Sequence, residues 1–417
     1  MPTVDPSELF SPAAMEEPYP LYARLRERAP VCELEGTGVF FVGSFAAVEE
    51  AVRRHEDFSA NLTGVLMLGE GGRPRVFDLS GSGTASDVIA TADEPDHAVQ
   101  RRIVQPVLAA GRVAELETEI RGFVAERVAR FVRAGGGDWC DAVAESLPAF
   151  VLMNLLGLDK HDLEVARRWA MMGGDLLGGN VDRERMAELL EETAAMTAFL
   201  GHHFDRTLAT PVASRPGNLT DALAGGVEAG ALSREQAVGI LVVLFGAAGE
   251  STASLLGCAV HLLARAPELQ QRLRSDPRLI DAFIEEAVRL ESPFRFHYRV
   301  VKRAAELCGT ALRPGQRLML AWAAANRDPE VFEDPDAIRL ERSQGRRHLG
   351  FGRGIHFCVG APIARLEVRV ALEELLSRTR RFDLDPAHPP AHVPSIFVRR
   401  LSHLALGTSG TLLERNL

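Results

Sequence analysis

Apolar residues recur three and four positions apart along most of the chain, which is the spacing of helices that bury one face. Shorter apolar runs, typical of strands, occur in fewer places. We therefore predict a mostly α protein with a small β subdomain. The predicted helices are Tyr19–Arg28, Ala46–Arg54, His97–Leu108, Arg112–Ala134, Cys140–Leu156, Asp162–Met172, Arg183–Thr207, Ser233–Ala264, Pro267–Ser275, Pro277–Glu291 and Ala361–Arg380, and the predicted strand regions are Val31–Val42, Tyr298–Val301, Arg317–Ala321 and Val393–Leu406.

One segment, Ala237–Ala264, is almost entirely apolar or small. As a helix it would be about 42 Å long at ~1.5 Å per residue, which is long enough to cross a membrane. Its middle, however, is interrupted by glycines and by Glu250, Ser251 and Thr252. A helix that is apolar all round lies either in a membrane or in the core of a large soluble protein. The polar interruption favours the core.

Two regions lack regular periodicity. Residues Asn61–Asp93 are rich in Gly, Ser, Pro and Thr, and Met171–Val181 is a glycine-rich break between two predicted helices. Long irregular segments of a compact domain are either disordered or functional. We favour the functional interpretation, in which the two segments are lids that cover a binding site.

Composition narrows the class of protein. The chain has 417 residues, and no Pro/Gly/Ser-rich linker divides it, so we expect one domain over residues 1–417. A net charge of −10 argues against nucleic-acid or anionic-membrane partners. The first residues form neither a basic nor an apolar leader, and the five cysteines are scattered, as in reduced cytosolic proteins. We therefore expect a cytoplasmic protein.

The most informative chemistry lies around Cys358. Glycines at 350, 352 and 354 precede it, and a predicted helix follows. A thiol at a helix N-terminus lies near free N–H groups and the positive end of the dipole, which favours the thiolate. A lone cysteine is usually a small buried apolar residue. A single thiolate suits haem better than zinc, which takes several ligands.

A second constellation interrupts the long apolar helix with the run Gly246-Ala247-Ala248-Gly249-Glu250-Ser251-Thr252. Small residues leave room beside the helix for a flat ligand. A hydroxyl within a helix can bond its own i−4 carbonyl and open the hydrogen-bond ladder locally. An acid beside a hydroxyl suits proton transfer. The alternative is a solvent-facing Glu with structural Ser and Thr.

The run Phe351-Gly352-x-Gly354-x-His356-x-Cys358-x-Gly360 resembles the haem-ligand signature of the cytochrome P450 family. The resemblance extends over nearly the whole chain. It implies the triangular helical prism of that family, with haem b (iron protoporphyrin IX) between the long central helix and the helix after the cysteine loop. It also implies a monooxygenase in which Cys358 is the proximal iron ligand and the electrons come from a ferredoxin and an NAD(P)H-dependent ferredoxin reductase.

The resemblance assigns further roles residue by residue. Glu250 and Ser251 take the acid and hydroxyl roles in proton delivery, and Thr252 lies about 100° further around the helix. Ala248 stands where glycine is common in the family, and Ser251 stands where threonine is usual. The haem would lie beside Ala247, Ala248, Phe351 and Gly352, and its propionates would bind His97, Arg101, Arg299 and His356.

Two more groups have implied roles. Glu286, Arg289 and Arg342 resemble the Glu-x-x-Arg network of the family, which is structural. A basic patch near the cysteine side of the haem would suit an acidic electron donor, although ordinary solvated charge is equally compatible with it. The patch comprises Arg101, Arg102, Arg346, Arg347 and Arg353.

The substrate is expected to be a small to medium hydrophobic molecule, such as a natural-product intermediate or a terpenoid, bound by a monomeric enzyme. Arg295 and His297 are candidate polar anchors. Hydroxylation is the expected reaction, and oxidative coupling, desaturation and peroxide-driven turnover are alternatives. A non-catalytic haem sensor or carrier is the alternative from another class. The predicted pocket regions are Asn61–Asp93, Met171–Val181, Leu244–Ala248, Phe294–His297 and Ser395–Phe397.

Overall fold

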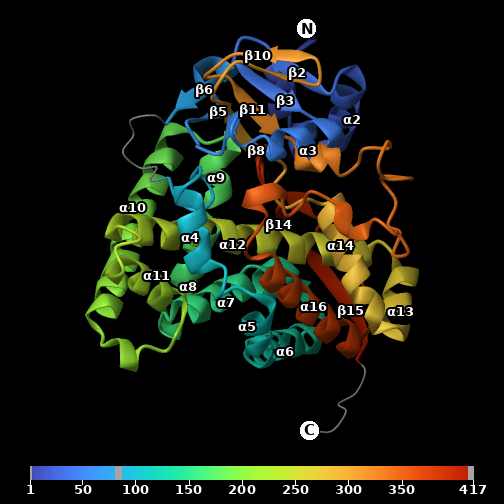
Figure 1. Cartoon of the computed structure of the whole chain (residues 1–417). Helices are drawn as coiled ribbons and strands as arrows, with labels where there is room; N and C mark the ends of the chain where they lie inside the picture. Colours follow the sequence, from blue (N-terminus) through green and yellow to red (C-terminus); the bar gives the residue numbers. More distant parts are fainter. Residues whose placement is uncertain (1, 80–86, 412–417) are drawn as a thin grey trace.

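The computed structural model describes residues 2–79 and 87–411. It confirms a mostly helical fold, in which α12 (Arg234–Ala264) crosses the middle of the molecule below the main sheet (Figure 1). The other α-helices are α1 (Pro12–Glu16), α2 (Tyr19–Arg28), α3 (Phe45–Arg53), α4 (Asp96–Val104), α5 (Ala110–Glu115), α6 (Glu117–Arg133), α7 (Ser146–Leu156), α8 (Leu163–Ala170), α9 (Gly173–Gly178), α10 (Arg183–Ala209), α11 (Leu219–Glu228), α13 (Pro267–Ser275), α14 (Ile280–Leu290), α15 (Trp322–Ala325) and α16 (Ala361–Arg378).

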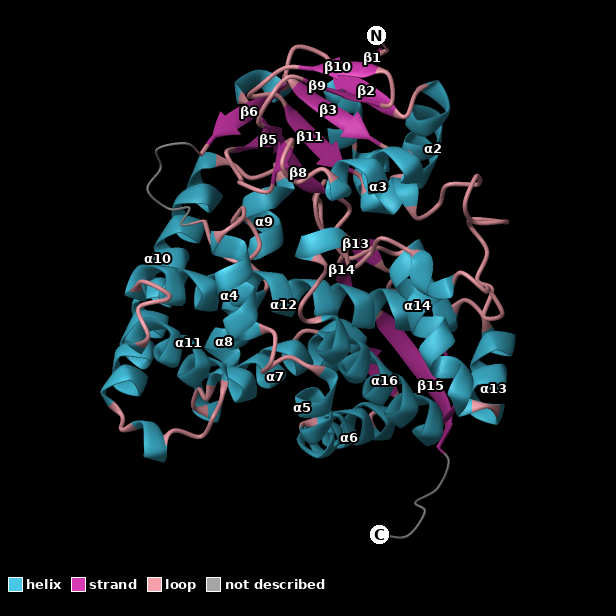
Figure 2. Ribbon diagram, in the orientation of Figure 1, coloured by secondary structure: helices cyan, strands magenta, loops and turns pink. Residues whose placement is uncertain are grey.

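Most strands gather at the N-terminal end of the molecule, and a second group lies near α16 (Figure 2). The larger sheet has the order β1-β2-β3-β11-β8-β4, and β11 runs parallel to β3 but antiparallel to β8. A three-stranded sheet has the order β12-β15-β7, and β5 pairs with β6, β9 with β10, and β13 with β14. The strands are β1 (Thr3–Val4), β2 (Val31–Leu34), β3 (Val39–Val42), β4 (Phe58–Ser59), β5 (Gly64–Leu68), β6 (Pro74–Asp78), β7 (Gly136–Asp138), β8 (His297–Val301), β9 (Ala305–Leu307), β10 (Thr310–Leu312), β11 (Arg317–Leu320), β12 (Thr379–Leu384), β13 (Ala391–His392), β14 (Leu401–His403) and β15 (Ala405–Thr411).

The central helix begins at a capping box. The Ser233 side chain accepts a hydrogen bond from the backbone N–H of Gln236, and the Gln236 side chain accepts one from the backbone N–H of Ser233. The helix is long and apolar enough to cross a membrane, but most of its apolar stretch is buried inside the protein. It is therefore the core helix that the polar interruption predicted.

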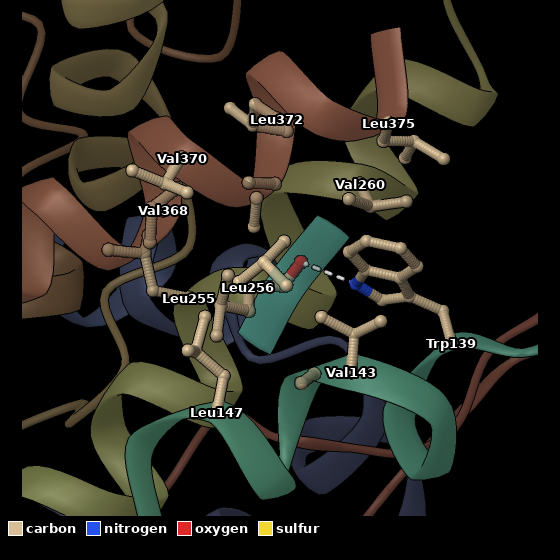
Figure 3. Close-up of a cluster of buried hydrophobic side chains, with 14 of the residues drawn as sticks. Trp139, Val143, Leu147, Leu255, Leu256, Val260, Val368, Val370, Leu372 and Leu375 are labelled. Atoms are coloured by element: carbon tan, nitrogen blue, oxygen red, sulfur yellow. Dashed lines mark hydrogen bonds between the residues drawn. The ribbon is translucent and has the colours of Figure 1, made fainter. Parts of the chain in front are cut away.

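Packing on α12 fixes the position of the helices around it. Leu255 and Leu256 of α12 contact residues of α7 and α16 in one buried cluster (Figure 3). The indole Nε1–H of Trp139 donates to the backbone carbonyl of Leu256 at 3.2 Å, so the ring is satisfied although it is fully buried. The other side chains labelled in that cluster are Val143, Leu147, Val260, Val368, Val370, Leu372 and Leu375.

The two predicted lids contain more regular structure than their sequences indicated. Residues 61–93 include the antiparallel hairpin β5–β6, and the glycine-rich break after α8 includes the short helix α9. The two regions meet where the Leu68 N–H donates to the Gly179 carbonyl at 2.8 Å. Part of the first region, residues 80–86, lies outside the described residues.

Several predicted boundaries were wrong. Arg112–Ala134 is two helices, α5 and α6, and Cys140–Leu156 begins with a π-helical turn before α7. The last predicted helix ends at Arg378 rather than Arg380, because Thr379 is extended and pairs with Thr411 of β15. Helix α11 was missed, since its two central glycines weaken helical propensity.

The cluster around α12 makes a quantitative prediction. Leu256→Ala removes a side chain that is 1% exposed, and we expect it to lower the free energy of unfolding by about 2–5 kcal/mol because a cavity remains. The same change at Leu190, which is 52% exposed on α10, is expected to cost less than about 0.5 kcal/mol. Urea unfolding of the two variants measures both, and equal losses would contradict the packing described.

Candidate functional site

The loop before α16 is folded by hydrogen bonds between its own backbone groups. The Cys358 N–H donates to the Phe351 carbonyl at 2.8 Å, and the Gly352 N–H donates to the Leu349 carbonyl at 2.8 Å. Gly352 and Gly354 have positive φ angles of 67° and 72°, which side chains rarely tolerate. A Cβ on Gly350 would collide with Val288 of α14, so glycine lets the loop pack directly on that helix.

A cavity lies between this loop and the central helix. Cys358 is partly exposed, and it lines this cavity together with Phe351 and Gly352. The α12 residues that line it are Val243, Leu244, Ala247, Ala248, Ser251, Thr252 and Leu255. Small side chains at 247 and 248 keep the helix close to the thiol without filling the space between them. The structure thus brings the loop and the central-helix motif to one site.

Burial dominates the electrostatics of the thiol. It raises the pKa of Cys358, and the N–H groups of Gly360 and Ala361, with Arg101 and Arg365, oppose the rise only in part. The N–H groups at the start of α16 thus favour the thiolate, and burial acts against them. Metal ligation, which displaces the proton from a thiol, is what ionises such a group.

Of the four predicted propionate partners, Arg101, Arg299 and His356 line the cavity, and His97 packs against His356. The rings of His97 and His356 are 4.2 Å apart, and burial, with Arg299 and His97, lowers the pKa of His356 to about 3. Burial also lowers the pKa of Arg299 to about 10. Arg101 lines the cavity, and burial lowers its pKa too.

Much of this cluster has no carboxylate partner in the described part of the chain. His97 Nδ1 lies 3.0 Å from a Glu94 carboxylate oxygen, but its buried Nε2 has no hydrogen-bond partner among the described residues. Within residues 2–79 and 87–411, neither Arg101 nor Arg299 forms an ion pair with a carboxylate. Buried cations require such partners. A flat apolar ligand with two carboxylates, such as haem, fits this donor set.

The acid of the central helix faces away from the cavity. Glu250 is fully buried, its Oε1 accepts from Arg400 Nε at 3.0 Å, and its Oε2 accepts from the Gly174 N–H. Burial raises the pKa of Glu250 to about 7, although Arg400 and the Gly174 N–H both lower it. Arg400 also donates to Glu145 at 3.0 Å. A carboxyl poised near neutral pH can both take up and release a proton.

The hydroxyls follow the acid but face the cavity. Ser251 Oγ donates to the Ala247 carbonyl at 2.7 Å, which is the i−4 bond expected from the sequence. Thr252 lines the same cavity and is 4% exposed. We expected Thr252 to point away from the position of Ser251. Both side chains nevertheless line the cavity, which extends around the face of α12 that carries them.

Sequence reasoning missed two residues. Glu367 of α16 lines the cavity, and its buried Oε2 has no hydrogen-bond partner in the described part of the chain. Burial raises its pKa well above the usual value. The sequence did offer a signal for Glu367, because this acid lies on the same apolar helix face as Ile363 and Leu366. Arg400 gave no signal, since only folding brings it to Glu250.

The Glu-x-x-Arg network is present and buried. Arg289 donates to Glu286 through Nε at 2.7 Å and Nη2 at 2.9 Å, and Arg342 Nε lies 3.2 Å from the same carboxylate. Arg339 contributes its backbone N–H to Glu286 at 2.9 Å. None of these side chains lines the cavity, which fits a structural role.

The two candidate substrate anchors differ. Arg295 is buried away from the cavity and donates to the carbonyls of Ala14 and Met15, so the expectation that it anchors a substrate is wrong. His297 does line the cavity. Its Nδ1 accepts from the Trp322 indole at 2.7 Å, and burial with Arg299 lowers its pKa to about 3. His297 is therefore neutral, with its proton on Nε2.

Known proteins resemble this chain in sequence and fold. Residues 180–398 match the family model described as Cytochrome P450. Cytochrome P450 144 of Mycobacterium tuberculosis H37Rv is 39% identical over 406 residues, covering 96% of this chain and 91% of the relative. Erythromycin C-12 hydroxylase of Saccharopolyspora erythraea is 32% identical and covers 87% of each chain. A mutant of P450 EryK in complex with erythromycin B has a TM-score of 0.81 at 27% identity and covers 96% of this chain and 99% of its own.

The position of Glu250 predicts a titration. An infrared band of a protonated carboxyl is expected to disappear with a midpoint near pH 7 and to be absent from Glu250→Gln. Arg400→Gln is expected to raise this midpoint, because the cation that favours the carboxylate is lost. Glu188→Gln, an exposed acid on α10, is the control and should leave the band unchanged. A band unaffected by Glu250→Gln would contradict the assignment.

Proposed function

Because this chain belongs to the cytochrome P450 family of haem-thiolate monooxygenases, we propose that it oxidises a small to medium hydrophobic molecule at a haem b held by Cys358. The observation that carries this proposal is the placement of one thiol in a cavity whose opposite wall is the small-residue face of α12. Arg101 and Arg299 line that cavity without a carboxylate partner among the described residues, and they would supply the charge that haem propionates need.

The residues that would hold the cofactor come from four parts of the chain, namely α4, α12, β8 and the loop before α16. When bound, haem b supplies the iron centre at which dioxygen is activated. Cys358 would ligate the iron, and the loop N–H groups would stabilise its thiolate. On the two faces and the edge of the macrocycle would lie Phe351, Gly352, Ala247, Ala248, His97, Arg101, Arg299 and His356.

Electrons would come from separate proteins. The sequence contains no flavin or iron–sulphur motif, and relatives of this family use a ferredoxin and an NAD(P)H-dependent reductase. The predicted basic patch remains a candidate docking surface, although Arg353 pairs with Glu49 at 3.2 Å and Arg347 lies over the Phe45 ring. Because ferredoxin and NAD(P)H are cytoplasmic reductants, we propose that the protein acts in the cytoplasm.

Proton delivery would use the acid and the two hydroxyls. Glu250 takes protons from the side of Arg400 and Glu145, and its backbone neighbour Ser251 presents a hydroxyl to the cavity. Burial raises the pKa of Glu367 well above its usual value, so this acid on α16 is a second candidate proton donor. Such a relay serves dioxygen activation and is not needed with peroxide, which favours a monooxygenase over a peroxide-driven enzyme or a haem sensor.

The cavity lining supports an apolar substrate that carries an oxygen atom. Leu152, Val243, Leu244 and Phe294 provide apolar surface, and the Nε2–H of His297 is a fixed donor among them. Similar proteins are described with erythromycin B and with testosterone, both in complexes with bacterial P450s. We therefore propose a natural-product intermediate or terpenoid-sized substrate, with hydroxylation as its reaction. The substrate-induced shift of the Soret band identifies it among candidate compounds.

The ligand assignment is tested by replacing the thiol. Cys358→Ala is expected to abolish the red-shifted ferrous–CO Soret band that thiolate ligation gives, because no second thiol lines the cavity in the described part of the chain. Cys308→Ala, which removes an exposed thiol elsewhere, is expected to leave the band intact. Survival of the band in Cys358→Ala would refute the proposal.

The hydroxyl assignment is tested at Ser251. Ser251→Ala removes the donor, and we expect a several-fold larger share of NAD(P)H electrons to end in hydrogen peroxide. Ser251→Thr keeps the hydroxyl and is expected to match the native enzyme. Peroxide and NAD(P)H are measured with ferredoxin, reductase and a compound that shifts the Soret band. Equal peroxide yields from Ser251→Ala and the native enzyme would rule out this role.

A further inference from the structure

Three side chains behind the cysteine loop have no part in the proposed chemistry. Glu285 lies on α14 and is 4% exposed, and His348 begins the loop and is 6% exposed. Arg365 lies on α16, about two turns after Cys358, and its side chain is 28% exposed. Buried charge of this kind is costly unless it is paired. Glu285 and Arg365 place such charge directly behind the loop that carries Cys358.

The directions of the hydrogen bonds are fixed. The Gly350 N–H donates to His348 Nδ1 at 3.1 Å, so this nitrogen is an acceptor and the ring proton sits on Nε2. Nε2–H then donates to Glu285 Oε2 at 3.0 Å. Arg365 binds the same carboxylate in bidentate fashion, through Nε at 2.6 Å and Nη2 at 3.0 Å. Burial opposes ionisation of Glu285, but His348 and Arg365 outweigh it and lower its pKa to about 2.

Arg365 also contacts the loop that carries the cysteine. Its guanidinium lies 4.4 Å from the centre of the Phe351 ring, and the Phe351 carbonyl accepts the N–H of Cys358. The guanidinium therefore contacts both the Glu285 carboxylate and the residue whose backbone holds Cys358.

We propose that Glu285 and Arg365 set the electron density at the Cys358 sulphur, Arg365 withdrawing it and Glu285 offsetting that withdrawal. His348 holds Glu285 against the start of the loop. All three are positioning residues, and the inference rests on the proposed ligation of haem by Cys358. Reduction of the iron adds negative charge at the site, so a positive charge beside the sulphur raises the midpoint potential and a negative charge lowers it.

The experiment is a redox titration of the haem-loaded full chain without substrate. Glu285→Gln leaves Arg365 uncompensated and is expected to raise the midpoint potential. Arg365→Gln is expected to lower it. The double variant removes both charges and is expected to return close to the native value, which a double-mutant cycle quantifies. Glu374→Gln, which removes a carboxylate of α16 that pairs with Arg378, is the control and should cause no shift.

A purely structural role gives a different result. Shifts of the two single variants in the same direction, or no shift, with the thiolate ferrous–CO band retained would overturn the inference. Arg365→Lys keeps the charge and loses the bidentate geometry, so it should stay near the native potential; a shift as large as that of Arg365→Gln would also overturn it. If one single variant fails to bind haem, the inference is judged on the remaining single variant, the double variant and Arg365→Lys. The last two are expected to have potentials close to the native value. Loss of the ferrous–CO band from the native protein would instead refute the proposed function.

Discussion

Two neighbouring glutamates of α14 fix the cysteine loop, and the rest of the site depends on their ion pairs. Glu285 binds His348 and Arg365 on either side of the loop, while Glu286 binds Arg289 and Arg342 behind it. Breaking a buried pair of this kind costs about 3–5 kcal/mol, because one charge remains unpaired. These pairs hold the segments that flank the loop, and the thiol of the loop lines the cavity beside α12.

The cavity carries polar groups that the protein alone does not satisfy. Among the described residues, His97 Nε2 has no hydrogen-bond partner and Arg299 has no carboxylate partner. Burial also raises the pKa of Glu367 well above its usual value. These groups cost free energy in the absence of a ligand and favour one that supplies two carboxylates and a metal cation. Cofactor binding is therefore expected to stabilise the fold, since a ligand that binds only the native state adds to its stability.

Much of the fold and the centre of the site could be predicted from local pattern. Helical spacing located α2, α12 and α13 to within a residue or two, and the glycine–cysteine run identified Cys358 as the candidate ligand. What could not be predicted depends on contacts between distant segments. The partner of Glu250 is Arg400, and the direction of Arg295 is set by carbonyls of α1. The thiol pKa also required the structure, because local sequence shows the helix dipole but not the burial that outweighs it.

The central claim is that one sulphur atom, that of Cys358, ligates the iron. X-ray absorption at the iron edge of the purified haem protein measures this directly. The account predicts one sulphur neighbour in the native protein and in Cys308→Ala, and none in Cys358→Ala. A native spectrum that contains only nitrogen or oxygen neighbours would contradict it.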